Sequence, residues 1–122
     1  MMRHLPGKRV LIVEDHPVLA FDIHDLITDA GAQTIGPALD LNTGMRLARE
    51  NHLDAALLDI DIDGEFVWPV AEELRRNNVP MIFISAQCET SEFPIHFRDH
   101  CCIDKPVIRN QVIDRLAGTL GC

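Results

Sequence analysis

The sequence predicts an α/β domain in which an open parallel sheet is covered by helices on both faces. Short runs that are apolar at every position alternate with segments of helical periodicity along the 122 residues. Strands of this continuously apolar kind fit a parallel sheet with two buried faces. The length matches one ordinary domain with a substantial core. The alternation favours right-handed crossovers between successive strands.

The elements follow from local patterns. Apolar runs predict strands at residues 10–13, 55–60, 81–84 and 101–103, and residues 33–36 are expected to form a short, weak strand. Helical spacing predicts four helices, at residues 17–30, 41–51, 67–74 and 112–120. Pro17 and Pro69 fit this assignment because the first turn of a helix tolerates proline. Between Ser85 and His100 there is no sustained helical periodicity and Pro94 interrupts the segment, so we expect a loop or one short turn there.

Charge and hydropathy exclude several classes of partner. The net charge of -8 and the pI near 5.0 disfavour binding to nucleic acids or to anionic membranes, because both require a basic surface. The longest apolar runs are strand-sized, far below the roughly 20 residues of a membrane span. The N-terminus lacks the hydrophobic segment of a signal peptide. We therefore expect a cytoplasmic protein with neither a nucleic-acid nor a membrane partner.

The sequence contains four cysteines, Cys88, Cys101, Cys102 and Cys122. No pair has the CxxC spacing, and the adjacent Cys101 and Cys102 would point to opposite faces of a strand. With 47% hydrophobic residues, the core does not require covalent crosslinks. We therefore expect reduced thiols, without a zinc or redox role.

Polar side chains stand at the ends of four predicted strands. Glu14 and Asp15 end the first strand, Asp59 ends the third, Ser85 ends the fourth, and Lys105 follows the fifth. Ligands of doubly wound sheets bind outside the carboxyl ends of the strands, where the strand order reverses. These five residues are therefore expected to meet in one crevice.

The residue types in this crevice favour phosphoryl chemistry. Three carboxylates suit a hard cation such as Mg²⁺, which prefers oxygen ligands. A lysine can neutralise a transferred phosphoryl group, and a serine hydroxyl can donate to one of its oxygens. An aspartate carboxylate can itself be phosphorylated. Because burying Asp59 beside Asp15 without a cation would be costly, Asp59 is the candidate nucleophile.

These residues lie in four motifs, VLIVED, ALLDIDIDG, MIFISA and IDKPV, and through them the chain resembles the receiver domain of two-component response regulators. The resemblance covers nearly the whole chain. It implies a flavodoxin-like fold with five parallel strands in the order 2-1-3-4-5. It also implies that residues 1–122 form a single receiver domain without an output domain.

The resemblance assigns roles to the residues of the crevice. Asp59 would be the phosphoacceptor, Ser85 the switch hydroxyl and Lys105 the lysine that neutralises the phosphoryl group. Glu14, Asp15 and Asp59 would hold Mg²⁺ together with a backbone carbonyl, which in this chain belongs to Asp61.

The implied function is that of a single-domain response regulator. It would accept a phosphoryl group from a sensor histidine kinase or phosphotransfer protein and lose it by slow autodephosphorylation, without the turnover of an enzyme. Its signal would pass through protein contacts to an unknown downstream protein, from a monomer or weak dimer. It could act as a relay, a phosphate sink or a regulator of a partner.

Two departures from the common receiver pattern refine this expectation. Residues 80–86, PMIFISA, are similar to a motif of single-domain receivers linked to HWE-type sensor kinases, in which the fourth helix is short or disordered. Cys102 stands where receivers usually have an aromatic residue that moves on activation. We therefore expect ordering of residues 86–99, rather than rotation of an aromatic ring, to carry the output.

Calcium binding is a first alternative, because Asp59, Asp61, Asp63 and Gly64 copy the first half of an EF-hand loop. That loop requires a bidentate glutamate at its twelfth position, where this chain has Val70, and a preceding helix, where it has a predicted strand. The pattern therefore fails at two points.

The second alternative is an aspartate-nucleophile phosphatase of the haloacid dehalogenase type, which shares the strand-end DxD pattern. That family normally adds a cap insertion and further acidic metal ligands, and no segment of this chain resembles them. Outside the crevice, we expect Asp63 and Glu65 to cap the third helix, and Phe66 and Trp68 to serve as packing groups.

Overall fold

The computed structural model describes residues 5–121, apart from the side chains of residues 119–121. Five parallel strands form one sheet in the order β2-β1-β3-β6-β7, which confirms the predicted order. The strands are β1 (Arg9–Val13), β2 (Gln33–Ala38), β3 (Ala55–Asp59), β6 (Met81–Ser85) and β7 (Cys102–Asp104). The helices are α1 (Pro17–Asp29), α2 (Leu41–Glu50), α3 (Trp68–Arg76) and α4 (Arg109–Gly121).

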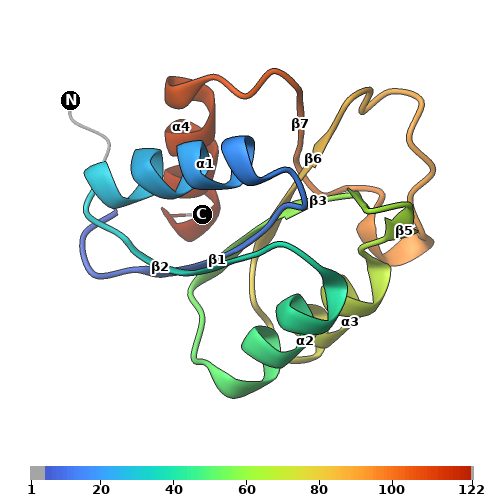
Figure 1. The fold of residues 1–122 in the computed structure, drawn as a ribbon, viewed down its shortest axis with the longest axis horizontal. Helices are drawn as coiled ribbons and strands as arrows, with labels where there is room; N and C mark the ends of the chain where they lie inside the picture. Colours follow the sequence, from blue (N-terminus) through green and yellow to red (C-terminus); the bar gives the residue numbers. More distant parts are fainter. Residues whose placement is uncertain (1–4, 122) are drawn as a thin grey trace.

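The sheet separates two helical layers. Helices α1 and α4 cover one face, and α2 and α3 cover the other (Figure 1). Along β1, Val10 and Ile12 pack into the α1 and α4 layer, whereas Leu11 and Val13 pack into the α2 and α3 layer. This alternation is the two-residue period of a strand. It explains why the central strands are apolar at every position.

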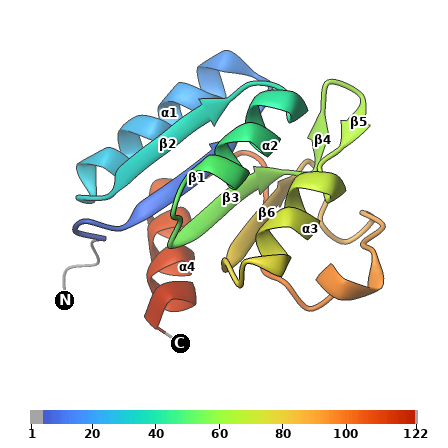
Figure 2. The ribbon, with the colours of Figure 1, turned by 90° about the horizontal axis from the view of Figure 1, so that it is seen from below.

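A short hairpin follows β3, and the sequence-based interpretation missed it. Strands β4 (Asp61–Ile62) and β5 (Glu65–Phe66) pair in antiparallel fashion and project beyond the end of β3 (Figure 2). Asp63 and Gly64 form the two-residue turn with φ angles of 53° and 82°. An Asp-Gly dipeptide favours this turn because both positions require positive φ. The Asp63-Gly64 dipeptide could therefore have predicted the hairpin from the sequence.

The hairpin corrects two expectations. Asp63 and Glu65 do not cap α3, because they lie in the hairpin and the N-cap of α3 is Val67, which makes no side-chain capping hydrogen bond. Phe66 is not a buried packing group: its side chain is 62% exposed, although its ring stacks on Trp68.

The segment between β6 and β7 contains only the 3₁₀ turn η1 (Ile95–Phe97). This confirms the expectation of a loop or one short turn, in place of a full helix, between these two strands. An aromatic cluster anchors this turn. Phe97 is fully buried, and its ring stacks on Trp68 with 5.7 Å between centroids and contacts Phe83 edge-on. Phe93 also packs against Trp68, with centroids 5.6 Å apart. Trp68 is therefore a partly buried packing group, as expected.

The expectation of reduced cysteines is wrong for two of them. Cys88 and Cys102 form a disulfide whose Cα atoms are 6.0 Å apart, within the usual range. The sequence did not predict this pairing, because the two cysteines are 14 residues apart and meet only where the loop that carries Cys88 folds back onto β7. Cys101 is free and packs on the face of the sheet opposite to Cys102, as expected for adjacent residues. Cys122 and the side chain of Leu120 lie outside the described residues.

No helix among the described residues is both long and apolar enough to cross a bilayer.

Removal of the Phe97 ring should destabilise the domain. We expect Phe97→Ala to lower the free energy of unfolding by about 3–5 kcal/mol, because a fully buried aromatic side chain leaves a cavity. Ile95→Ala in the same turn is the matched control, since Ile95 is 74% exposed and should change stability little. Urea unfolding followed by circular dichroism measures both, and equal effects would contradict the anchoring role of Phe97.

Candidate functional site

The sheet order brings the predicted residues to one edge. Asp59 ends the central strand β3, which lies between β1, followed by Glu14 and Asp15, and β6, which ends at Ser85. Lys105 directly follows the edge strand β7, and its backbone N–H donates to the Ser85 carbonyl at 2.9 Å. The strand order reverses between β1 and β3. The acidic residues therefore lie where ligands of such sheets bind.

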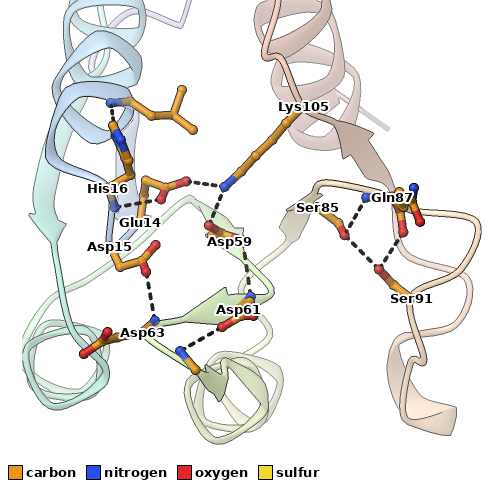
Figure 3. Close-up of polar contacts among 12 residues, drawn as sticks. Glu14, Asp15, His16, Asp59, Asp61, Asp63, Ser85, Gln87, Ser91 and Lys105 are labelled. Carbon is orange, nitrogen blue, oxygen red and sulfur yellow. Dashed lines mark hydrogen bonds and ion pairs between the residues drawn. The ribbon is translucent and has the colours of Figure 1, made fainter.

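Lys105 reaches from this edge into the acidic cluster. Its Nζ atom donates to Oδ2 of buried Asp59 at 2.7 Å and lies 3.3 Å from Oε1 of Glu14 (Figure 3). Partial burial alone would lower the pKa of Lys105, but the hydrogen bond and charge of Asp59, together with Glu14, raise it above the ordinary value. The side chain therefore carries a positive charge at neutral pH.

Glu14 is the most deeply buried acid of the site. Its Oε2 accepts the backbone N–H of His16 at 2.9 Å. Its Oε1 is close to Lys105, but it is buried without a hydrogen-bond partner among the described residues. Burial, reinforced by the charge of Asp59, raises the pKa of Glu14 to about 8 against the opposing His16 hydrogen bond. One lysine does not compensate all of these carboxylates.

Asp15 connects the site to the hairpin. Its Oδ2 accepts the backbone N–H of Asp63 at 2.9 Å. Partial burial would raise the pKa of Asp15, but this hydrogen bond and the interaction with Glu14 lower it below its usual value. Asp15 therefore stays ionised at neutral pH. Asp63 takes part through its backbone, which sequence reasoning did not anticipate.

The acidic cluster fits a hard divalent cation. Glu14, Asp15 and Asp59 each offer a carboxylate oxygen, and these oxygens lie within 4.8 Å of one another. The unpartnered buried oxygen of Glu14 indicates that this donor set is incomplete without a further cation. Oxygen donors of this type suit Mg²⁺. Asp61 lies beside the cluster, because its backbone N–H donates to Oδ1 of Asp59 at 3.2 Å.

Ser85 lines the site, but its hydroxyl is occupied elsewhere. Its Oγ atom lies 2.8 Å from Oγ of Ser91 and accepts the Gln87 N–H at 3.2 Å (Figure 3). Ser91 donates its one hydroxyl hydrogen to the Gln87 carbonyl at 2.8 Å. Since each hydroxyl has one hydrogen, Ser85 must be the donor in its contact with Ser91. No hydrogen bond joins Ser85 to Asp59 in the described part of the chain.

A cavity of about 620 Å³ opens over these groups. Five of the six predicted residues line it, namely Asp15, Asp59, Asp61, Ser85 and Lys105, whereas Glu14 lies outside its lining. The cavity also includes Phe66 and Ser91, which sequence reasoning did not place there. The hairpin places Phe66 at the cavity, and the Asp63-Gly64 dipeptide was the sequence signal for this hairpin. Ser91 lies on the irregular loop after β6, and no pattern in the sequence predicts the path of that loop to the cavity.

Residues 10–117 match the sequence model of the response regulator receiver domain. Among curated proteins, the transcriptional activator protein IrlR of Burkholderia pseudomallei is 31% identical over 87 residues, which are 69% of this chain. The chain spans 37% of the length of IrlR. These matches give no support to the phosphatase alternative.

Solved structures agree with the fold. The response regulator PhyR from Brucella abortus superposes with a TM-score of 0.85 and 27% identity, covering 98% of this chain and 50% of that chain. The receiver domain of sensor histidine kinase PA1611 from Pseudomonas aeruginosa gives a TM-score of 0.79 at 23% identity, over 95% of this chain and 99% of that one. That structure contains a magnesium ion coordinated in its active site cleft.

The raised pKa of Glu14 predicts how stability depends on pH without metal. A carboxyl whose folded pKa of about 8 exceeds its ordinary 4.5 favours folding when protonated, so this contribution is lost as the pH rises between these values. In EDTA, we expect the free energy of unfolding to fall from about pH 5 to about pH 8. Glu14→Gln should reduce this decline, because the amide stays neutral. An unchanged slope in urea titrations of the variant would contradict this assignment.

Proposed function

Because the chain belongs to the response regulator receiver domain family, we propose that it accepts a phosphoryl group on Asp59 and signals as a single-domain response regulator. The observation that carries this proposal is the position of Asp59. Its carboxylate ends the central strand, is paired with Lys105 at 2.7 Å and faces a cavity. Glu14 and Asp15 flank it with further carboxylate oxygens.

Asp59 is suited to act as the nucleophile. The Asp61 N–H and the Lys105 ammonium fix the orientation of its two oxygens. One carboxylate oxygen would form a bond to phosphorus while the bond between phosphorus and the donor imidazole nitrogen breaks. The electron pair of that bond goes to the departing imidazole. Such a transfer depends on positioning and charge neutralisation, which this rigid strand end provides.

Lys105 and the acidic cluster would balance the charge of the transferred group. The Lys105 ammonium already lies against Asp59 and would contact the oxygens of a phosphoryl group attached there. Glu14, Asp15, Asp59 and the backbone carbonyl of Asp61 would hold Mg²⁺, which supplies positive charge to the phosphoryl oxygens when bound. Phosphoryl transfer is then followed by slow hydrolysis rather than by enzymatic turnover.

Ser85 would report whether Asp59 is phosphorylated. Its hydroxyl hydrogen is donated to Ser91 in the resting arrangement. To donate to a phosphoryl oxygen, Ser85 would have to break this hydrogen bond, and we expect the turn over residues 86–91, which carries the acceptor Ser91, to adjust. The switch in this chain therefore consists of an exchange of hydrogen-bond acceptors. It does not require an aromatic residue at position 102.

The partners follow from this function. The donor would be a sensor histidine kinase or phosphotransfer protein, and the short η1 turn with the PMIFISA motif favours an HWE-type kinase. Phosphorylation would alter contacts with a downstream protein, in the cytoplasm and from a monomer or weak dimer. The charge of -8 argues against direct binding of nucleic acid or membrane.

The phosphoacceptor can be tested with acetyl phosphate and Mg²⁺. We expect intact-protein mass spectrometry to detect one added phosphoryl group, and Asp59→Asn to reduce labelling to background because the nucleophile is lost. Asp63→Asn is the matched control: position 63 has φ of 53°, which asparagine adopts readily, and its role is through the backbone.

Labelling of the Asp59→Asn variant at the level of the unmodified protein would show that Asp59 is not the phosphoacceptor. Loss of labelling in Asp63→Asn would indicate that the hairpin rather than the carboxylate limits the reaction. Sustained hydrolysis of a generic phosphate ester would instead favour a phosphatase.

The metal requirement can be tested at Asp15. We expect Asp15→Asn to weaken Mg²⁺ binding by at least about tenfold, because one charged oxygen ligand is lost. Isothermal titration calorimetry of the metal alone measures this affinity. Asp40→Asn, which alters an exposed helix-capping acid outside the site, should bind Mg²⁺ normally. Equal affinity in Asp15→Asn would exclude Asp15 as a ligand.

A further inference from the structure

The Cys88–Cys102 disulfide joins the two segments that the proposed switch has to move relative to each other. Cys102 lies in β7, three residues before Lys105, and Cys88 lies three residues after Ser85. We propose that this pair is a reversible redox clamp, which when oxidised holds the turn after Ser85 in its resting arrangement and weakens capture of a phosphoryl group. The inference rests on the proposed roles of Asp59 and Ser85.

The first argument is that the clamp acts on the resting hydrogen bonds of Ser85. The backbone N–H of Ser91 donates to the Cys88 carbonyl at 3.3 Å, so Cys88 belongs to the turn that carries Ser91. Ser91 in turn accepts the hydroxyl hydrogen of Ser85. Fixing Cys88 to β7 therefore fixes the acceptor that Ser85 must leave.

The second argument is that few other restraints hold this turn. Its residues 86, 87, 89 and 90 are exposed, and their burial contributes little to order. Cys88 is attached to β7 by its disulfide and by the hydrogen bond from its N–H to Oδ1 of Asp104 at 2.7 Å. Reduction removes the covalent link and leaves a single exposed hydrogen bond between Cys88 and β7, beside the hydrogen bonds within the turn itself, so the turn should become more mobile.

The third argument is chemical access. Cys88 and Cys102 are both partly exposed, so a small thiol or disulfide can reach their sulfur atoms. With glutathione disulfide as oxidant, the Cys88 thiolate attacks one of its sulfurs and releases one glutathione thiolate. The Cys102 thiolate then attacks the Cys88 sulfur of the mixed disulfide and releases the second. Two electrons pass from the protein to the oxidant, and the two released glutathione thiolates take up the two protein protons.

Cys101, the residue immediately before β7, provides a control. It points to the opposite face, and its Sγ accepts a hydrogen bond from Arg115 at 2.7 Å. Cys101→Ser therefore removes a neighbouring thiol without breaking the clamp. Cys88→Ser should mimic the reduced protein under all conditions.

The experiment compares protein equilibrated with glutathione disulfide or with dithiothreitol, with the redox state checked by non-reducing mass spectrometry. Amide hydrogen exchange of residues 86–92 measures the clamp itself. Beryllofluoride with Mg²⁺ serves as the phosphoryl mimic, and its affinity is read from the fluorescence of Trp68, the single tryptophan, which packs against Phe93 directly after this segment.

We expect reduction to speed exchange in residues 86–92 and to tighten beryllofluoride binding by roughly fivefold or more, the lower end of common coupling between sites. Cys88→Ser should show both effects without reductant, and Cys101→Ser should respond like the unmodified protein. Equal exchange in both redox states, equal beryllofluoride affinity, or thiols that stay reduced in excess glutathione disulfide would overturn the clamp. If neither form binds beryllofluoride, the phosphoacceptor function fails, whereas the exchange comparison still decides whether the clamp exists.

Discussion

The structure depends on the compensation of buried carboxylates at the end of the central strand. Asp59 and Glu14 are both buried, and Lys105 is the cation that contacts both within the described residues. Removing such charges from water is costly unless they are paired. The protein meets this cost partly with Lys105, partly with backbone N–H groups from His16 and Asp61, and partly by protonation of Glu14. The remaining deficit of positive charge favours binding of a cation at this site.

The hydrophobic architecture keeps this cluster in place. Strand β3 is buried along its whole length between two helical layers, so the backbone of Asp59 has little freedom. By contrast, the turn after Ser85 is exposed and is held by a few polar bonds and one disulfide. If Asp59 is the phosphoacceptor and Ser85 the sensor, as proposed, a rigid acceptor would lie beside a loosely held sensor. The energy of a new hydrogen bond could then move the sensor without disturbing the core.

Much of this could be predicted from the sequence. Continuously apolar runs located four of the five strands of the sheet, and β2 was expected only as a short, weak strand. Residues at the carboxyl ends of the strands identified the crevice, because parallel strands necessarily bring those ends together. Features that depend on irregular backbone were missed. The hairpin had a signal in Asp63-Gly64, but the contact of Ser91 with Ser85 and the pairing of Cys88 with Cys102 arise from the path of a loop without periodicity. Such paths are set by tertiary contacts, here the aromatic cluster around Trp68.

We propose that the carboxylate of Asp59 itself carries the phosphoryl group, and this can be tested chemically. Borohydride reduces an aspartyl phosphate to homoserine, and peptide mass spectrometry then locates the modified position. After treatment with acetyl phosphate and Mg²⁺, we expect homoserine at position 59 and at no other aspartate. Homoserine at Asp15 or Asp61, or its absence from a protein that retains the phosphoryl group, would contradict it.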